Sequence, residues 1–157
     1  MKNYILILIL FFSLNSYSVE IVIESYGLYG VSGSKRVLQM GAPSGYTNLA
    51  ERFYLLETTN KIPMKLGETF GLMYRVEEGC ENGVVLEERI MIPNATMVRP
   101  KDSFKVSEII GTFVAECGAQ LNFMFGFDEE RELVPGKWVF SIGPPSKTLI
   151  SKEFNIE

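Results

Sequence analysis

The heptapeptide Leu121-Asn122-Phe123-Met124-Phe125-Gly126-Phe127 determines the structural class of this chain. Large apolar side chains occupy every second position, and this period places all four on one face of an extended strand. After the turn at Pro135-Gly136, the same alternation returns in Trp138, Phe140 and Ile142. These side chains therefore predict the buried core of a β-sheet protein.

The alternation extends toward the N-terminus in short segments that glycine and proline separate. Glycines 30 and 33 predict a turn between two strands, and Asn82-Gly83 predicts a tight hairpin turn. The pattern indicates about eight or nine strands. We predict an all-β protein, an antiparallel immunoglobulin-like β-sandwich, with a small β-barrel as the alternative. Predicted strands include residues 19–29, 35–40, 49–58, 68–76, 84–92, 104–110, 137–142 and 148–156.

Residues 1–18 have the layout of a secretory signal peptide. Lys2 gives a positive start, residues 4–12 form an apolar run, and small residues precede Val19 at the −3 and −1 positions. The run is too short to span a bilayer, which needs about 20 residues. We therefore predict cleavage before Val19 and an exported, periplasmic or secreted protein. Residues 19–157 would form a single soluble β-sandwich domain without a membrane span.

The charge balance and the two cysteines narrow the class of partner and the compartment. Removal of the signal peptide, which contains Lys2, leaves 14 basic residues against 19 acidic ones. The mature chain is therefore net negative, and nucleic acid is not an expected partner. Cys80 and Cys117 are both in the exported part, and in an oxidising compartment an even pair predicts a disulfide. Their spacing is unlike that of a redox or metal-binding pair.

The chain contains no histidine, which removes the commonest general base and zinc ligand. We predict a protein that is not an enzyme, with no catalytic, cofactor-binding or metal-binding residues. Glutamates are abundant, however, so hydrolysis by a carboxylate pair stays an alternative. Residues 128–132 are interpreted as a solvated acidic loop, and Glu87-Glu88 as part of an acidic edge that opposes aggregation.

Three segments resemble a bacterial family of exported proteins with a domain of unknown function. These segments are the loop 41–46, the pair Ile62-Pro63 with residues 66–71, and residues 132–138, ending in Pro135-Gly136-Lys137-Trp138. The resemblance spans most of the mature chain and rests on turn and core positions. It implies the sandwich fold and supplies no functional residues.

The alternating pattern does not assign four tyrosines to the buried face of a strand. These are the candidate partner contacts: Tyr26, Tyr29, Tyr46 and Tyr54. Tyrosine suits such contacts because a large apolar ring carries a polar hydroxyl. The sequence favours a non-enzymatic module that binds an unknown protein or polymer of the cell envelope. An enzyme or inhibitor that acts on envelope polymers through glutamates, and a structural subunit of a surface assembly, are the alternatives.

Overall fold

The computed structural model describes residues 18–38, 46–93, 97–98 and 105–157. The predicted signal peptide, apart from Ser18, and the loop 41–45 lie outside these residues. Almost every described element is a strand, and no described helix is long and apolar enough to cross a membrane. The elements are β1 (Glu20–Leu38), β2 (Tyr46–Glu57), β3 (Lys61–Ile62), β4 (Thr69–Glu78), β5 (Val84–Met91), β6 (Met97–Val98), β7 (Lys105–Val106), β8 (Glu108–Ala115), β9 (Gln120–Gly126), the 3₁₀ helix η2 (Glu130–Glu132), β10 (Gly136–Gly143) and β11 (Ile150–Ile156).

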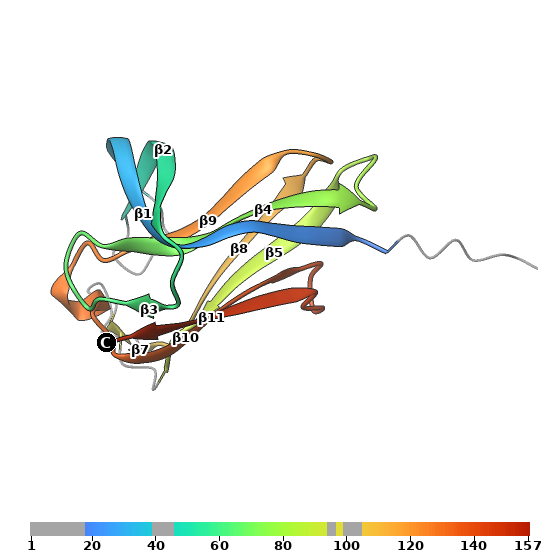
Figure 1. The fold of residues 1–157 in the computed structure, drawn as a ribbon. Coiled ribbons are helices and arrows are strands. Elements are labelled where there is room, and N and C mark those ends of the chain that lie inside the picture. The colour runs from blue at the N-terminus through green and yellow to red at the C-terminus, as the bar shows by residue number, and fades with distance from the viewer. Residues whose placement is uncertain (1–17, 39–45, 94–96, 99–104) are drawn as a thin grey trace, which may run out of the picture.

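Two sheets form the layers of a sandwich (Figure 1). The first sheet has the order β2-β1-β4-β9, and the second has the order β3-β11-β10-β5-β8. Strand pairs in both are antiparallel except β3 with β11, and β6 and β7 make a small separate ladder. The nine strands of the two layers agree with the predicted immunoglobulin-like sandwich. The sheets remain separate, so the alternative of a closed barrel is wrong.

The sequence prediction is also wrong about the first strand, because β1 runs without a turn through both Gly30 and Gly33. Its first half pairs with β4, and its second half pairs with β2 to form an arm that projects from the sandwich (Figure 1). At Gly30 the ring of Tyr54 lies where a Cβ would be, 2.2 Å from that position. Glycine at this position allows the ring to lie against the backbone.

The core is an aromatic cluster between the layers, and Phe70 of β4 lies at its centre. Its ring centroid is 5.3 to 6.1 Å from those of five other aromatic residues, which come from β9, β10, β11 and the chain just after β9. Trp138 is fully buried and donates its indole N–H to the carbonyl oxygen of Val134 over 2.9 Å. The predicted core residues Phe123, Phe127 and Phe140 are buried as well.

A disulfide joins Cys80 to Cys117 at one end of the sandwich. Cys80 lies in the turn from β4 to β5, and Cys117 lies in the turn from β8 to β9. Both turns carry the chain from one sheet to the other. The bond therefore connects two crossings between the layers, and Cys117 is not part of a strand.

The acidic segment after β9 is partly buried, which corrects its interpretation as a solvated loop. Glu132 of η2 is 3% exposed and accepts hydrogen bonds from the backbone N–H groups of Asp128 (2.7 Å) and Glu129 (3.0 Å). Burial raises the pKa of Glu132, and these two hydrogen bonds act in the opposite direction. Glu132 thus closes the turn by accepting hydrogen bonds from two of its backbone N–H groups.

Candidate binding site

The outer surface of strands β5 and β8 is the part of the described molecule that best fits a binding site. We call it the β5–β8 face. Cross-strand partners there include Val85 with Val114, and Arg89 with Ile110. Four large apolar side chains are exposed on it, by 44 to 65% of their area. The outward side chains are Val85, Glu87, Arg89, Met91, Glu108, Ile110, Thr112 and Val114.

An ion-paired arginine lies at the middle of this face. Arg89 donates to Glu87 from Nε (3.2 Å) and Nη2 (2.7 Å), and to Glu108 of the neighbouring strand from Nη1 (2.7 Å). The hydrogen bonds with Glu87 are the main reason that the pKa of Arg89 is raised. The guanidinium is thereby held in one position among the exposed apolar side chains of the face, which is the arrangement of a preorganised contact.

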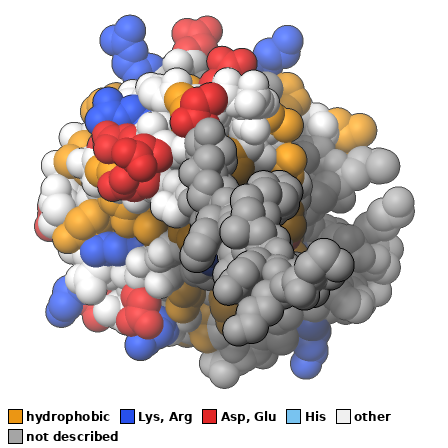
Figure 2. Space-filling view, turned by 90° about the vertical axis from the view of Figure 1, so that its right-hand side faces the viewer, with side chains coloured by type: hydrophobic (Ala, Val, Ile, Leu, Met, Phe, Trp, Pro, Cys, Tyr) orange, Lys and Arg blue, Asp and Glu red, His pale blue; other side chains and the backbone are white. Residues whose placement is uncertain are grey.

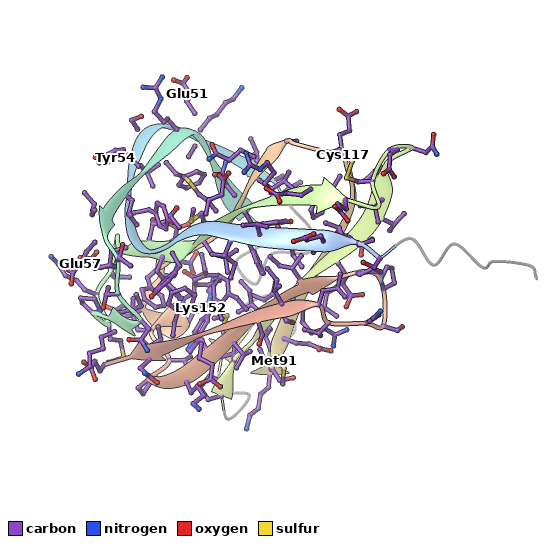
Figure 3. All side chains as sticks on the ribbon, turned by 45° about the vertical axis from the view of Figure 1, so that its right-hand side comes forward. Glu51, Tyr54, Glu57, Met91, Cys117 and Lys152 are labelled. Carbon is purple, nitrogen blue, oxygen red and sulfur yellow. A yellow bond between two sulfur atoms is a disulfide. The ribbon has the colours of Figure 1, made fainter. Side chains whose placement is uncertain are left out.

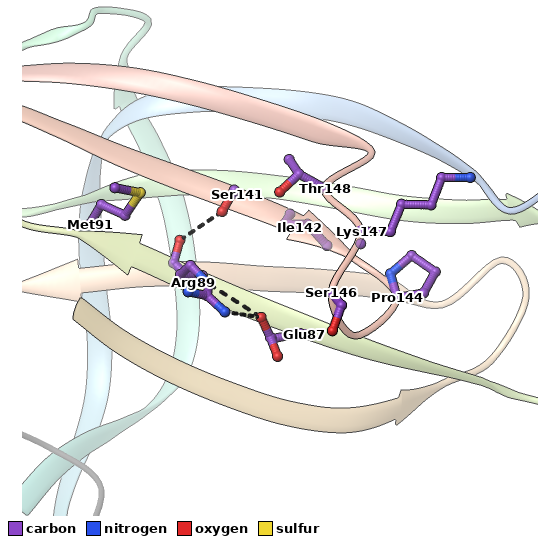
Figure 4. A pocket seen from close by; sticks show the side chains of 10 residues that line it. Glu87, Arg89, Met91, Ser141, Ile142, Pro144, Ser146, Lys147 and Thr148 are labelled. Carbon is purple, nitrogen blue, oxygen red and sulfur yellow. Dashed lines mark hydrogen bonds and ion pairs between the residues drawn. The ribbon is translucent and has the colours of Figure 1, made fainter.

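A hollow of about 280 Å³ opens beside Arg89 (Figure 4). The turn between β10 and β11 arches over one end of it, and Met91 borders the other end. The hydroxyl of Ser141 lies within it and donates to the backbone carbonyl of Arg89 over 3.4 Å. The hollow offers hydroxyls, a carboxylate and an apolar rim, and its size suits one side chain of a partner. It is lined by Glu87, Arg89, Met91, Ser141, Ile142, Gly143, Pro144, Ser146, Lys147 and Thr148.

On its inner side, β5 carries one member of a polar pair that lies inside the sandwich. Tyr74 of β4 donates its hydroxyl to Oε1 of Glu88 on β5 over 2.8 Å, and this bond links the two sheets. Burial raises the pKa of Glu88 to about 7, while the hydrogen bond from Tyr74 acts in the opposite direction. Burial also raises the pKa of Tyr74, and the charge of Glu88 adds to the rise.

Glu88 is reachable from the edge of the sheet because its partner on β8 is Gly111. Leu86 and Ile90, which share the inward phase of Glu88, are 0% and 3% exposed, whereas Glu88 is partly exposed. A Cβ at Gly111 would meet no atom within 4 Å. The missing side chain therefore leaves open space on β8 at the position paired with Glu88.

The structure scatters the four predicted tyrosines. Tyr29 is 3% exposed and shares a hydrogen bond with Ser25, so it cannot contact a partner from this position, and burial raises its pKa. Tyr26 is half-buried, and the amino group of Lys152 lies 3.1 Å from its ring centroid. The side chain of Tyr46 lies outside the described residues.

Tyr54 is 49% exposed on the arm, far from Met91 on the opposite layer (Figure 3). Of the three candidate tyrosines whose side chains the structure describes, it is the most exposed. Leu56, two positions further along the same strand, is 61% exposed. The arm is thus a second exposed apolar surface.

Charges of both signs are mixed over the surface. In the part of Figure 2 that is not grey, acidic and basic side chains are interspersed with hydrophobic ones. Arg89 and Arg75 are each paired with two glutamates. No group of three or more metal-ligating side chains occurs within the described ranges. This surface has none of the single-sign field that a polyanion would need.

A family model for a domain of unknown function (DUF3859) matches residues 18–156. The chain belongs to this family. The predicted resemblance to a family of unknown function with an immunoglobulin-like fold is thereby confirmed. No curated protein sequence matches the DUF3859 chain.

The DUF3859 chain has been compared with solved structures. It is similar to an immunoglobulin-like protein from Pseudomonas aeruginosa, with a TM-score of 0.62 and 20% identity over 88% of this chain and 97% of that one. A β-glucosidase from Listeria innocua gives a TM-score of 0.41 and 12% identity over 90% of this chain and 16% of that one. A β-glucosidase from Kluyveromyces marxianus gives 0.39 and 14% over 90% and 15%. The likeness to the Pseudomonas aeruginosa protein shows the fold alone.

Sequence reasoning missed the β5–β8 face and Glu88. A signal for Glu88 was present, because it shares the phase of Leu86 and Ile90 and so belongs to the inward face of its strand. The interpretation of Glu87-Glu88 as one acidic edge is therefore wrong: Glu87 faces out toward Arg89, and Glu88 faces in toward Tyr74.

Proposed function

We propose that this protein is an exported, non-enzymatic binding module of the cell envelope, and that it contacts a protein partner through the β5–β8 face. The observation that carries the proposal is the exposure of Val85, Met91, Ile110 and Val114 around the ion-paired Arg89. Protein interfaces are enriched in methionine and arginine, and their strongest contacts combine apolar area with a fixed guanidinium.

The non-enzymatic part of the proposal is supported by the surroundings of Glu88. A raised pKa is expected of a catalytic acid. Hydrolysis by a carboxylate pair, however, needs a second carboxylate facing the first. The inward positions next to Glu88 on β8 and β10 are Gly111, Ile109 and Ile142, and its described hydrogen-bond partner is Tyr74. Among the described inward side chains beside Glu88, no second carboxylate is present.

The export proposal makes a prediction about the mature protein. We expect the chain purified from the envelope fraction of its own cells to begin at Val19 and to contain no free thiol. Intact mass, measured with and without reductant and alkylating agent, checks both points. An uncleaved N-terminus, or two thiols that alkylate without reduction, would contradict export to an oxidising compartment.

The binding surface can be tested with two matched substitutions. Val114 on the β5–β8 face is 65% exposed and Leu56 on the arm is 61% exposed, so lysine at either position should leave the fold intact. We expect Val114→Lys to reduce the capture of a cross-linked envelope protein by about tenfold or more, because a charge is then desolvated in the contact. Leu56→Lys should retain the capture of the same protein.

The opposite pattern would overturn the assignment. If Leu56→Lys loses the partner while Val114→Lys keeps it, the arm is the contact surface. If the wild type co-sediments with purified envelope polymer, and Val114→Lys does so equally, the partner is not a protein on this face. Circular dichroism and unfolding curves of both variants confirm that each comparison is made between folded proteins.

A further inference from the structure

We infer that β8 receives an extended segment of the partner protein as an additional strand, and that a lysine or arginine of this segment passes over Gly111 to Glu88. The inference rests on the proposed binding function and specifies the chemistry of the partner. Strand addition of this kind uses backbone hydrogen bonds for affinity and alternate side chains for specificity.

The edge that β8 presents lacks the usual protection. β8 is the last strand of its sheet, has eight residues and contains neither proline nor lysine, and its one charged residue is Glu108 at the start. Natural sheet edges are normally shortened or carry charges to prevent pairing with another chain. The other edge of this sheet is β3, which has two residues, and the arm strand β2 carries Glu51, Arg52 and Glu57. β8 is thus one of two long edge strands with little or no charge in the described chain; the other is β9 of the first sheet, and Glu88 lies beside β8.

The side chains of β8 suit an added strand on both faces. Ile110 and Val114 are exposed on the outer face, and Ile109 and Phe113 are half-buried on the inner face. Apolar cross-strand neighbours stabilise a sheet pair. Between the two inner residues lies Gly111, where the space over the strand is open.

The length of the inserted side chain follows from the sheet geometry. A strand added to β8 lies two strand spacings from β5, which is about 10 Å. Lysine or arginine can extend far enough from that position to meet the carboxyl group of Glu88, whereas valine and leucine cannot. Glu88 is the charged group that faces this space; its neighbours are Tyr74 on β4 and apolar side chains on β8 and β10. The inward-facing Lys152 of β11 is held against the ring of Tyr26. An acidic group in apolar surroundings selects a basic partner.

The test uses synthetic nine-residue peptides of alternating valine and threonine whose central residue is lysine, leucine or glutamate. We expect the full exported protein to bind the lysine peptide at least tenfold more tightly than the leucine peptide at pH 8, and the glutamate peptide least. Amide exchange should slow along β8. Glu88→Gln should abolish the preference for lysine while still binding the leucine peptide.

Gly111→Val is the second variant. It should fold, because the position is open and valine favours strands, but it fills the space and should weaken the lysine peptide at least tenfold. Glu88 adds a pH dependence. A lysine contact requires the ionised carboxylate, so with a free pKa of about 7 binding should be about 30-fold weaker at pH 5.5 than at pH 8. Glu88→Gln should bind independently of pH in this range.

Three results would overturn the inference: equal binding of the lysine and leucine peptides, unchanged binding by Gly111→Val, or exchange protection on β2 in place of β8. The proposed function can survive each of them, because Val114→Lys tests the outer face without a peptide. Conversely, if the proposed function is wrong, Val114→Lys captures the envelope protein as well as the wild type does. The two failures are therefore distinguishable.

Discussion

Removal of the Cys80–Cys117 disulfide is expected to lower the free energy of unfolding by about 4 kcal/mol. The two cysteines are separated by 37 positions, and closing a loop of that length restricts the unfolded chain. The loss should be visible in urea unfolding followed through the fluorescence of Trp138, the single tryptophan of the chain, which is fully buried. Reduced wild type should unfold at a clearly lower urea concentration than the oxidised protein.

Alanine variants separate the bond from the packing of its sulfur atoms. Cys80 is 2% exposed and Cys117 is exposed, so Cys80→Ala loses buried contacts that Cys117→Ala keeps. The double variant Cys80→Ala/Cys117→Ala in oxidising conditions should have nearly the same free energy of unfolding as reduced wild type. The remaining difference is the loss of buried contacts at Cys80, which is smaller than the effect of the disulfide. Equal unfolding midpoints with and without reductant would show that the bond does not stabilise the fold.

A bond of this strength also has a consequence for the compartment. The two inter-sheet crossings at this end of the sandwich are connected through it. Cytosolic thiols are kept reduced, so a chain retained there would lose this contribution to stability. The position of the disulfide is therefore consistent with the predicted cleavage before Val19 and export of the chain.

The core could be predicted from the sequence because period two follows from backbone geometry alone. In a strand, successive side chains point to opposite faces, so Phe123, Trp138 and Phe140 were placed together before any tertiary contact was considered. The paired cysteines followed in the same way from compartment chemistry. Neither prediction depends on the order of the strands in the sheets.

Features that depend on a neighbouring strand were missed. Gly30 and Gly33 resemble a turn in the sequence, but the side chains of Tyr54 and Glu51 from β2 lie over them in a continuous strand. Glu132 resembles a solvated charge, but it accepts from two backbone donors of its own turn. The open space on β8 beside Glu88 depends on the register of Glu88 with Gly111, which the order of strands in the sheet determines.

Glu88 should make the stability of the protein depend on pH. The pKa of a glutamate in the unfolded chain is 4.5, and burial raises that of Glu88 to about 7. Below pH 4.5 the group is protonated in both states, and the folded protein has its full stability. Between these values the folded chain retains a proton that the unfolded chain releases, so stability falls as pH rises.

The expected loss between pH 4.5 and pH 8 is about 2 to 3 kcal/mol, since partial exposure beside Gly111 screens some of the burial effect. Urea unfolding at a series of pH values measures it. Glu88→Gln should reduce the slope of this part of the profile, because the amide does not titrate, and Glu132, whose pKa is also raised, accounts for a remaining slope. Glu87→Gln, one position along and on the outer face, should keep the full slope.

Tyr74→Phe distinguishes a titrating Glu88 from a general effect of acidic residues. The hydroxyl of Tyr74 favours the ionised form of Glu88, so its removal should raise the pKa of the carboxyl further and extend the fall in stability to higher pH. A net-charge effect would be the same in Tyr74→Phe and wild type, because tyrosine is neutral in this range. If Glu88→Gln keeps the slope of the wild type, the pKa of Glu88 is the same in the folded and unfolded chains. In that case the expected pH dependence of binding to a basic side chain is also wrong.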